Sequence, residues 1–271
     1  MNGFQTGLAM RLTEADLKFL VETVATSHED QDRIIELVRG KEDFLDQMLD
    51  NPLLLQRILN DEEVFVRISP HMLFSVLLHQ IRRELEKETY INEVGLRGQR
   101  IPVFEAPDVV ELLDEKEARD YLIDMLSSFA RTRSTVTYWI ERGRLRRRRF
   151  SDMDMDDMIQ LCSQADPEVR PAYYKRIADI ALFLAGIFPD QATYFAARPS
   201  RRYTRGRTLN DYEREGQTFY GLAARESREA TLESAFRTLS EKFTLARRAL
   251  NVLSERYMRS QKAQYFGLPT A

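Results

Sequence analysis

The sequence predicts an all-α, multi-helix bundle with at most one short β-hairpin, near residues 94–105. Apolar residues recur at steps of three and four along most of the 271 residues, which is the spacing of one helix face. Capping signals precede many of these periodic stretches. Hydrophobic residues make up 43% of the chain, enough for a sizeable core, so a disordered chain is not expected.

Helix-start signals recur through the first 90 residues. Thr13 with Asp16 is typical of a capping box, in which a hydroxyl and a carboxylate each accept a hydrogen bond from the other's backbone N–H group. Asn51–Pro52 and Ser69–Pro70 place proline at the first helical position, where its missing N–H is harmless. The helices expected from these and similar signals cover about 14–26, 27–40, 41–50, 52 onward and 70–90.

Glycine and proline interrupt this pattern at residues 94–107, so a loop or one small hairpin is expected there. Helical periodicity then returns, with Asp108 and Ser151 as expected N-caps. The apolar stretch Ile180–Phe188 predicts a helix that is buried on all sides. The helices expected in this part cover a short segment from 108, then 115–131, 151–165, 172–188, 209–226 and 228–262.

The last of these helices has a heptad seam, on which apolar residues alternate in steps of four and three. Such a seam packs either within its own chain or against a second copy, and the sequence leaves both open. We expect the side chains of this seam and of the apolar helix to be buried. The residues with this expectation are Leu182, Phe183, Ile187, Phe236, Leu239, Phe243, Leu250 and Leu253.

The charges divide the chain into an acidic front and a basic back. Residues 1–130 contain 14 Lys and Arg against 26 Asp and Glu, a net charge of −12. Residues 131–271 contain 26 against 17, a net charge of +9. We therefore expect an acidic N-terminal helical bundle over 1–130 and a basic helical region over 131–271, in one compact body or two lobes. This asymmetry points to a polyanion partner or to charge pairing within or between chains.

Arginines concentrate in two segments of the basic half. Eight of them lie between Arg131 and Arg149, where Glu141 is the only acid, and more follow in the irregular connector 189–207. Guanidinium groups bind phosphate in a bidentate way that an ammonium cannot. The residues predicted to contact a polyanion are Arg142, Arg144, Arg146, Arg147, Arg148, Arg149, Arg201, Arg202, Arg205 and Arg207.

The segment 134–161 resembles the reading head of MerR-type and excisionase-type winged helix-turn-helix proteins. Ser134, Thr135, Tyr138, Trp139, Gly143 and Leu145 match the recognition helix and turn of those families, and Arg148, Arg149, Phe150, Ser151 and Asp152 match the far strand of the wing. The resemblance implies DNA reading by a helix in the major groove. Only 144–149 separate the two matches, which is short for a two-stranded wing. An amphipathic helix ending in a solvated arginine loop is the alternative.

Sites for catalysis, cofactors or metals are not predicted. His71 and His79 are eight residues apart, about 80° around a helix. Asp152, Asp154 and Asp156 have calcium-loop spacing, but Asp157 stands where that loop needs glycine. No nucleophile, base and acid form a recognisable set. We therefore expect no metal and no cofactor, and the sequence favours a non-catalytic protein over an enzyme.

A cytoplasmic protein without a membrane span is expected. The N-terminus lacks the basic and apolar regions of a secretory signal, and the longest apolar stretch has nine residues against the roughly 20 that cross a bilayer. The lone Cys162 fits a reducing compartment as a small core residue. The function expected is that of a helical interaction protein, with nucleic acid or another polyanion as its partner. The alternative is self-association through complementary acidic and basic faces.

Overall fold

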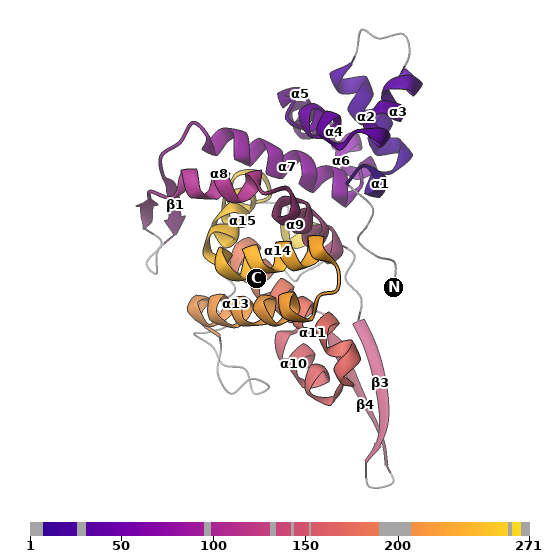
Figure 1. Cartoon of the computed structure of the whole chain (residues 1–271), viewed down its shortest axis with the longest axis vertical. Helices are drawn as coiled ribbons and strands as arrows, with labels where there is room; N and C mark the ends of the chain where they lie inside the picture. Colours follow the sequence, from indigo (N-terminus) through magenta and orange to yellow (C-terminus); the bar gives the residue numbers. More distant parts are fainter. Residues whose placement is uncertain are drawn as a thin grey trace. The chain divides into compact units, whose positions relative to one another are not determined.

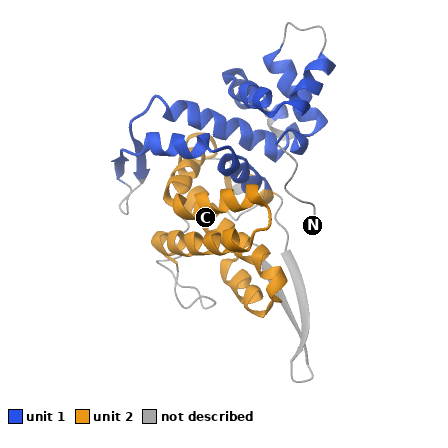
Figure 2. Cartoon of the chain, viewed as in Figure 1, with its two compact units in different colours: residues 1–127 blue, residues 128–271 orange. Residues whose placement is uncertain are grey.

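The computed structural model describes residues 8–25, 31–94, 99–130, 134–141, 144–151, 153–189, 207–259 and 262–266. The chain divides into two compact units, residues 1–127 and 128–271 (Figure 2). Helices dominate the described residues, so the predicted all-α class is confirmed (Figure 1). Within the described ranges, none of the helices combines the length and apolar character needed to cross a bilayer.

The first unit is made of helices and one hairpin. Short connections link most of them, as the capping signals predict. Its elements are α1 Leu8–Arg11, α2 Glu14–Val24, α3 Gln31–Gly40, α4 Glu42–Leu49, α5 Pro52–Asn60, α6 Glu62–Arg67, α7 Pro70–Leu85, β1 Ile91–Val94, β2 Arg100–Val103, α8 Ala106–Asp114 and α9 Lys116–Phe129, which ends two residues beyond the division.

The predicted capping box at Thr13 is confirmed and also joins two distant helices. Thr13 Oγ1 accepts from the backbone N–H of Asp16, and Asp16 Oδ2 accepts from the N–H of Thr13 at 2.8 Å. Asp16 Oδ1 accepts from the backbone N–H of Ser69, the N-cap of α7, also at 2.8 Å. Asp16 is completely buried, so this one carboxylate holds the starts of α2 and α7 together.

The hairpin near 94–105 is also confirmed. β1 and β2 are antiparallel, with Ile91 opposite Val103 and Val94 opposite Arg100. Tyr90 and Phe104 follow in the same register, and their ring centroids are 5.9 Å apart. The predicted cap at Asp108 is wrong: α8 begins at Ala106, so Asp108 lies in its first turn, where a carboxylate favourably opposes the positive helix end.

The second unit is built around helix α11. Its elements are β3 Ser134–Glu141, β4 Arg144–Ser151, α10 Met155–Gln164, the 3₁₀ turn η1 Pro167–Val169, α11 Arg170–Ile187, α13 Leu209–Glu226, α14 Ala230–Glu241, α15 Phe243–Tyr257 and α16 Lys262–Tyr265. Cys162, on α10, is buried as expected.

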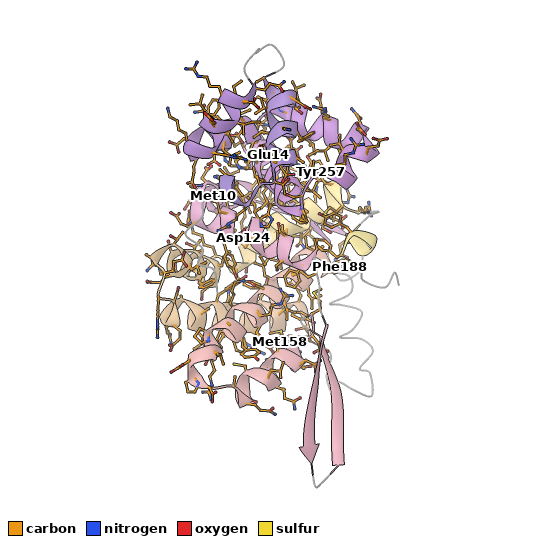
Figure 3. The ribbon with its side chains drawn as sticks, turned by 90° about the vertical axis from the view of Figure 1, so that its right-hand side faces the viewer. Met10, Glu14, Asp124, Met158, Phe188 and Tyr257 are labelled. Carbon is orange, nitrogen blue, oxygen red and sulfur yellow. The ribbon has the colours of Figure 1, made fainter. Side chains whose placement is uncertain are left out.

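Helix α11 is buried around nearly its whole circumference from Ile177 onward, as its apolar sequence predicts. Helices α10, α13 and α15 all pack against it. The ring of Phe183 stacks on Phe129 with centroids 4.1 Å apart and meets Phe266 edge-on at 4.8 Å. Phe188, labelled in Figure 3, lies just beyond the end of the helix and is also buried.

Polar side chains from α15 and α16 cap the C-terminal end of α11. Asn251 Nδ2 donates to the carbonyls of Ala185 and Gly186, at 3.1 and 2.6 Å. Ser254 Oγ and Lys262 Nζ both donate to the carbonyl of Ile187, at 2.8 and 2.9 Å. The last carbonyls of a helix have no partner within it, so these bonds satisfy groups that burial would otherwise leave unpaired.

The single long C-terminal helix predicted over 228–262 is wrong, because the chain breaks at Lys242 into α14 and α15. The break lets α14 pack mainly on α13 while α15 packs mainly on α11. All eight side chains expected to be buried are buried, with at most 4% of their surface exposed. At the positions described, the seam therefore packs within its own chain.

Close helix contact at Gly216 gives a testable prediction. A Cβ atom on Gly216 would overlap Cε2 and Cζ of the buried Phe243 ring. Gly216→Ala should therefore destabilise the second unit by about 1–3 kcal/mol through overpacking. Peptide-resolved hydrogen exchange of α13 and α15 measures the loss. Gly40→Ala is the control: its Cβ meets nothing within 4 Å, so it should leave α3 unchanged or slightly more protected. Unchanged exchange in Gly216→Ala would contradict the packing.

The buried ring of Phe243 gives a second prediction. Phe243→Ala should cost about 3–5 kcal/mol of unfolding free energy, because it leaves a cavity between α13 and α15. The matched control is Phe104→Ala, since that ring is 72% exposed and its removal leaves no cavity. Urea unfolding followed by circular dichroism compares the two. A loss below about 1 kcal/mol in Phe243→Ala would place the ring outside the core.

Candidate polyanion-binding site

The arginine-rich segment forms a two-stranded antiparallel ribbon, β3–β4. Its register pairs Ser134 with Ser151 and Glu141 with Arg144, so only two residues lie between the strands. β3 is rich in Thr, Val, Tyr, Trp and Ile, the β-branched and aromatic residues that favour strands. A two-residue connection is the commonest length for a hairpin.

This ribbon overturns three predictions made for the segment. The recognition helix from Ser134 is wrong, because those residues form β3. The amphipathic helix with a solvated arginine loop is wrong for the same reason. The ribbon is also the second hairpin of the described residues, whereas the sequence predicted at most one. The recognition helix was expected from the family resemblance, whereas the β-branched and aromatic residues of 134–141 favour a strand.

The cap predicted at Ser151 is corrected as well. Ser151 is the last residue of β4, and α10 begins four residues later with Asp154 as its N-cap. Asp154 Oδ1 accepts from the backbone N–H groups of Asp156 and Asp157 at 3.0 and 3.1 Å. Burial, together with the charges of Asp157 and Asp156, raises the pKa of Asp154 despite these hydrogen bonds.

Five of the predicted site residues lie along β4: Arg144, Arg146, Arg147, Arg148 and Arg149. At about 3.3 Å per residue, they extend over about 17 Å of strand. Each DNA strand carries one phosphate per 3.4 Å of helix axis, roughly the same linear spacing. Glu141 is the only acid in the two strands. The ribbon therefore has a density of positive charge that matches a nucleic-acid backbone.

The register also decides which residues share a face, because directly paired residues lie on one side of a ribbon and successive pairs alternate. Arg146 is opposite Trp139 and Arg148 is opposite Thr137, and these two pairs share one face. Arg147 is opposite Tyr138 and Arg149 is opposite Val136, on the other face. Arg144, opposite Glu141, shares the face of Arg146 and Arg148, so one face carries three of these arginines with one acid and the other carries two.

The remaining predicted residues lie elsewhere. Arg142, Arg201, Arg202 and Arg205 fall outside the residues that the structure describes. Arg207 is described, and it forms ion pairs with Asp156 at 2.5 Å and with Glu215 at 2.9 Å. Burial alone would lower its pKa, but these two carboxylates outweigh burial and raise it. Arg207 thus joins the start of α10 to α13, so its guanidinium group is engaged within the second unit.

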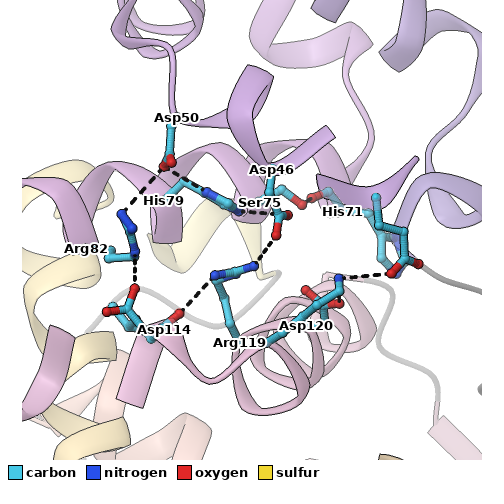
Figure 4. Close-up of polar contacts among 12 residues, drawn as sticks. Asp46, Asp50, His71, Ser75, His79, Arg82, Asp114, Arg119 and Asp120 are labelled. Carbon is cyan, nitrogen blue, oxygen red and sulfur yellow. Dashed lines mark hydrogen bonds and ion pairs between the residues drawn. The ribbon is translucent and has the colours of Figure 1, made fainter. Parts of the chain in front are cut away.

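A polar cluster in the first unit is the other concentration of charge, and the sequence did not predict it (Figure 4). His79 is almost completely buried. Its Nδ1 lies 3.0 Å from Asp50 Oδ1, and its Nε2 lies 3.8 Å from Asp46 Oδ1. Arg119 Nη2 donates to Asp46 Oδ2 at 2.7 Å, and Arg82 Nε donates to Asp114 Oδ1 at 2.5 Å.

These contacts join α4, α7, α8 and α9 through alternating basic and acidic side chains. Asp124 on α9, labelled in Figure 3, extends the cluster through ion pairs with Arg11 and His71. Ser75 lies one turn before His79, but it is fully buried and donates to the carbonyl of His71, so it is not an exposed nucleophile. Across the described ranges, no group of three or more potential ligands converges to hold a metal ion. The cluster thus links helices of the first unit through hydrogen bonds and ion pairs.

A local signal for this cluster was present in the sequence. Asp46 and Asp50 are four residues apart on one helix, as are His71, Ser75 and His79 on another, so each set lies on one face. The pairing of the two faces could not be predicted, because His79 and Asp50 are 29 residues apart and Arg119 and Asp46 are 73 apart.

Compared with protein-family models, curated proteins and solved structures, the chain matches none of them. The charge and geometry of the ribbon β3–β4 are therefore the basis on which a function can be proposed.

Asp50 gives a prediction on pH. Burial opposes its ionised form, but the hydrogen bond with His79 and the charges of His79, Arg82 and Arg119 outweigh burial and lower the pKa of Asp50 below 3.8. A lowered folded-state pKa stabilises the fold above 3.8, and the contribution is lost as the pH falls through the folded-state value. Asp50→Asn should thus destabilise the protein at neutral pH, and the difference from wild type should shrink in acid.

Urea unfolding at a series of pH values measures this difference. Asp43→Asn is the control, because it removes the same charge from an exposed position on α4. A difference between wild type and Asp50→Asn that stays constant from neutral pH into acid would contradict the role of the carboxylate charge.

Proposed function

We propose that this protein binds nucleic acid, without catalysis, through the arginines of the ribbon β3–β4. The observation that carries the proposal is the register of the ribbon, which aligns five arginines in one strand with a partner strand containing one acid. We also expect it to act in the cytoplasm, in keeping with its single buried, free cysteine.

The residue types in the ribbon support nucleic acid over other polyanions. Arginine recognises phosphate through a planar fork of donors and also stacks on flat rings. Tyr138 and Trp139, in the partner strand, are of the type that stacks on bases. A two-stranded ribbon is one of the two elements that the major groove of DNA admits.

The helices of the second unit serve as the scaffold for this ribbon. Several of their arginines are already held by internal partners. Arg247 Nε donates to Glu213 at 2.6 Å, and the guanidinium of Arg176 lies over the ring of Phe129 at 4.1 Å from its centroid. With Arg207 also paired, these arginines belong to the packing of the helices. The ribbon is proposed as the contact with phosphate because its two strands contain five arginines and one acid.

Replacing four ribbon arginines tests the proposal. Arg146, Arg147, Arg148 and Arg149 all changed to Ala should abolish most binding to a labelled short duplex or single strand, measured by fluorescence anisotropy. Wild type should bind at micromolar concentration at about 50 mM salt. Each lost phosphate contact should reduce the log–log salt slope by about 0.9 for duplex DNA.

The control removes the same charge from elsewhere in the second unit. Arg225, Arg228, Arg237 and Arg259 are exposed on or beside its helices, and their joint change to Ala should leave binding nearly intact. Equal binding by wild type and the ribbon variant would contradict the proposal, as would no binding by wild type. If the ribbon variant instead disrupts self-association in sedimentation analysis, the opposite charges of 1–130 and 131–271 act between copies, in a head-to-tail assembly.

A further inference from the structure

We infer that the ribbon β3–β4 binds duplex DNA by entering the major groove edge-on, that is, with one long strand edge first. Each face of the ribbon is then turned toward one of the two phosphate backbones that form the walls of the groove. This inference rests on the proposed function and names the class of nucleic acid and the mode of binding. The observation behind it is the distribution of arginines over the two faces, which the backbone register determines.

The two faces are nearly equivalent in charge. One face carries Arg144, Arg146 and Arg148 together with the acid Glu141, and the other carries Arg147 and Arg149. A ribbon that lies flat against a surface, or flat on the groove floor, uses the arginines of one face and leaves those of the other face unused. An even distribution instead suits a ligand that presents phosphates on both sides of the ribbon.

The dimensions of the ribbon agree with this mode. Sheets pack face to face at about 10 Å, which approximates the thickness of a strand layer with its side chains. The major groove of B-DNA is about 12 Å wide and about 8.5 Å deep, so a layer of this thickness fits between its walls. The minor groove, at about 6 Å, is too narrow without deformation. Strands of eight residues extend about 26 Å, or about eight base-pair steps.

Two consequences follow for selectivity. Edge-on entry presents strand backbone rather than side chains to the base edges, so binding should depend little on sequence. The major groove of duplex RNA is deep and too narrow for side chains to enter, so duplex DNA should be preferred over duplex RNA of the same sequence.

Two matched double variants test the mode of binding. Arg146→Ala with Arg148→Ala leaves one face with only Arg144, opposite Glu141, and Arg147→Ala with Arg149→Ala removes both arginines of the other face. For edge-on entry, both pairs should weaken binding to a short DNA duplex by a similar factor, at least about tenfold at about 50 mM salt, and each should reduce the salt slope by up to about 1.8. Lysine at the same positions keeps the charge and should restore most of the affinity in both pairs.

The outcomes separate this inference from the function on which it rests. If one pair abolishes binding and the other has no effect, the ribbon binds flat through one face, and the edge-on mode is wrong while nucleic-acid binding stands. Equal affinity for duplex RNA and duplex DNA would also overturn it, as would tighter binding to a single strand. If wild type binds none of these ligands, the proposed function itself fails.

Discussion

The arrangement of the second unit depends on the burial of helix α11 on all sides. From Ile177 to Phe188 the chain presents no face that could remain in water, so several helices must surround it. α10, α13 and α15 meet this need, and close approach is possible where Gly186 faces Leu250 and Gly216 faces Phe243. The break at Lys242 follows from the same constraint, because α14 and α15 cover different helices.

Paired charges organise the first unit in a comparable way. Asp16, His79 and Arg119 are buried, and each has a polar partner in another helix or at another helix start. Burial of an unpaired charge costs several kcal/mol, whereas a paired one costs far less, so the positions of the partners constrain how the helices pack. Asp16, Asp46 and Asp50 are thus engaged within the fold. The ribbon differs, since its two strands contain five arginines and one acid.

Local signals in the sequence predicted most of the fold. The caps at Thr13, Asn51 and Ser69 and the burial of the α11 core are where the sequence places them, because a cap or an apolar face is determined by residues a few positions apart. The segment 134–151 was misjudged because its register depends on pairing with a second strand, which a helical period does not reveal. The His79 cluster was missed for a similar reason, since its partners are distant in sequence. Among the arginines predicted to contact a polyanion, Arg207 instead forms ion pairs with Asp156 and Glu215 within the fold.

Hydrogen exchange of the backbone amides, compared with and without a saturating DNA duplex, tests the central claim most directly. The account predicts that added protection is largest in peptides covering 134–151, while peptides from α2 to α9 exchange at the same rate in both states. Binding without added protection in 134–151, or with its main protection in the helices of the first unit, would contradict it.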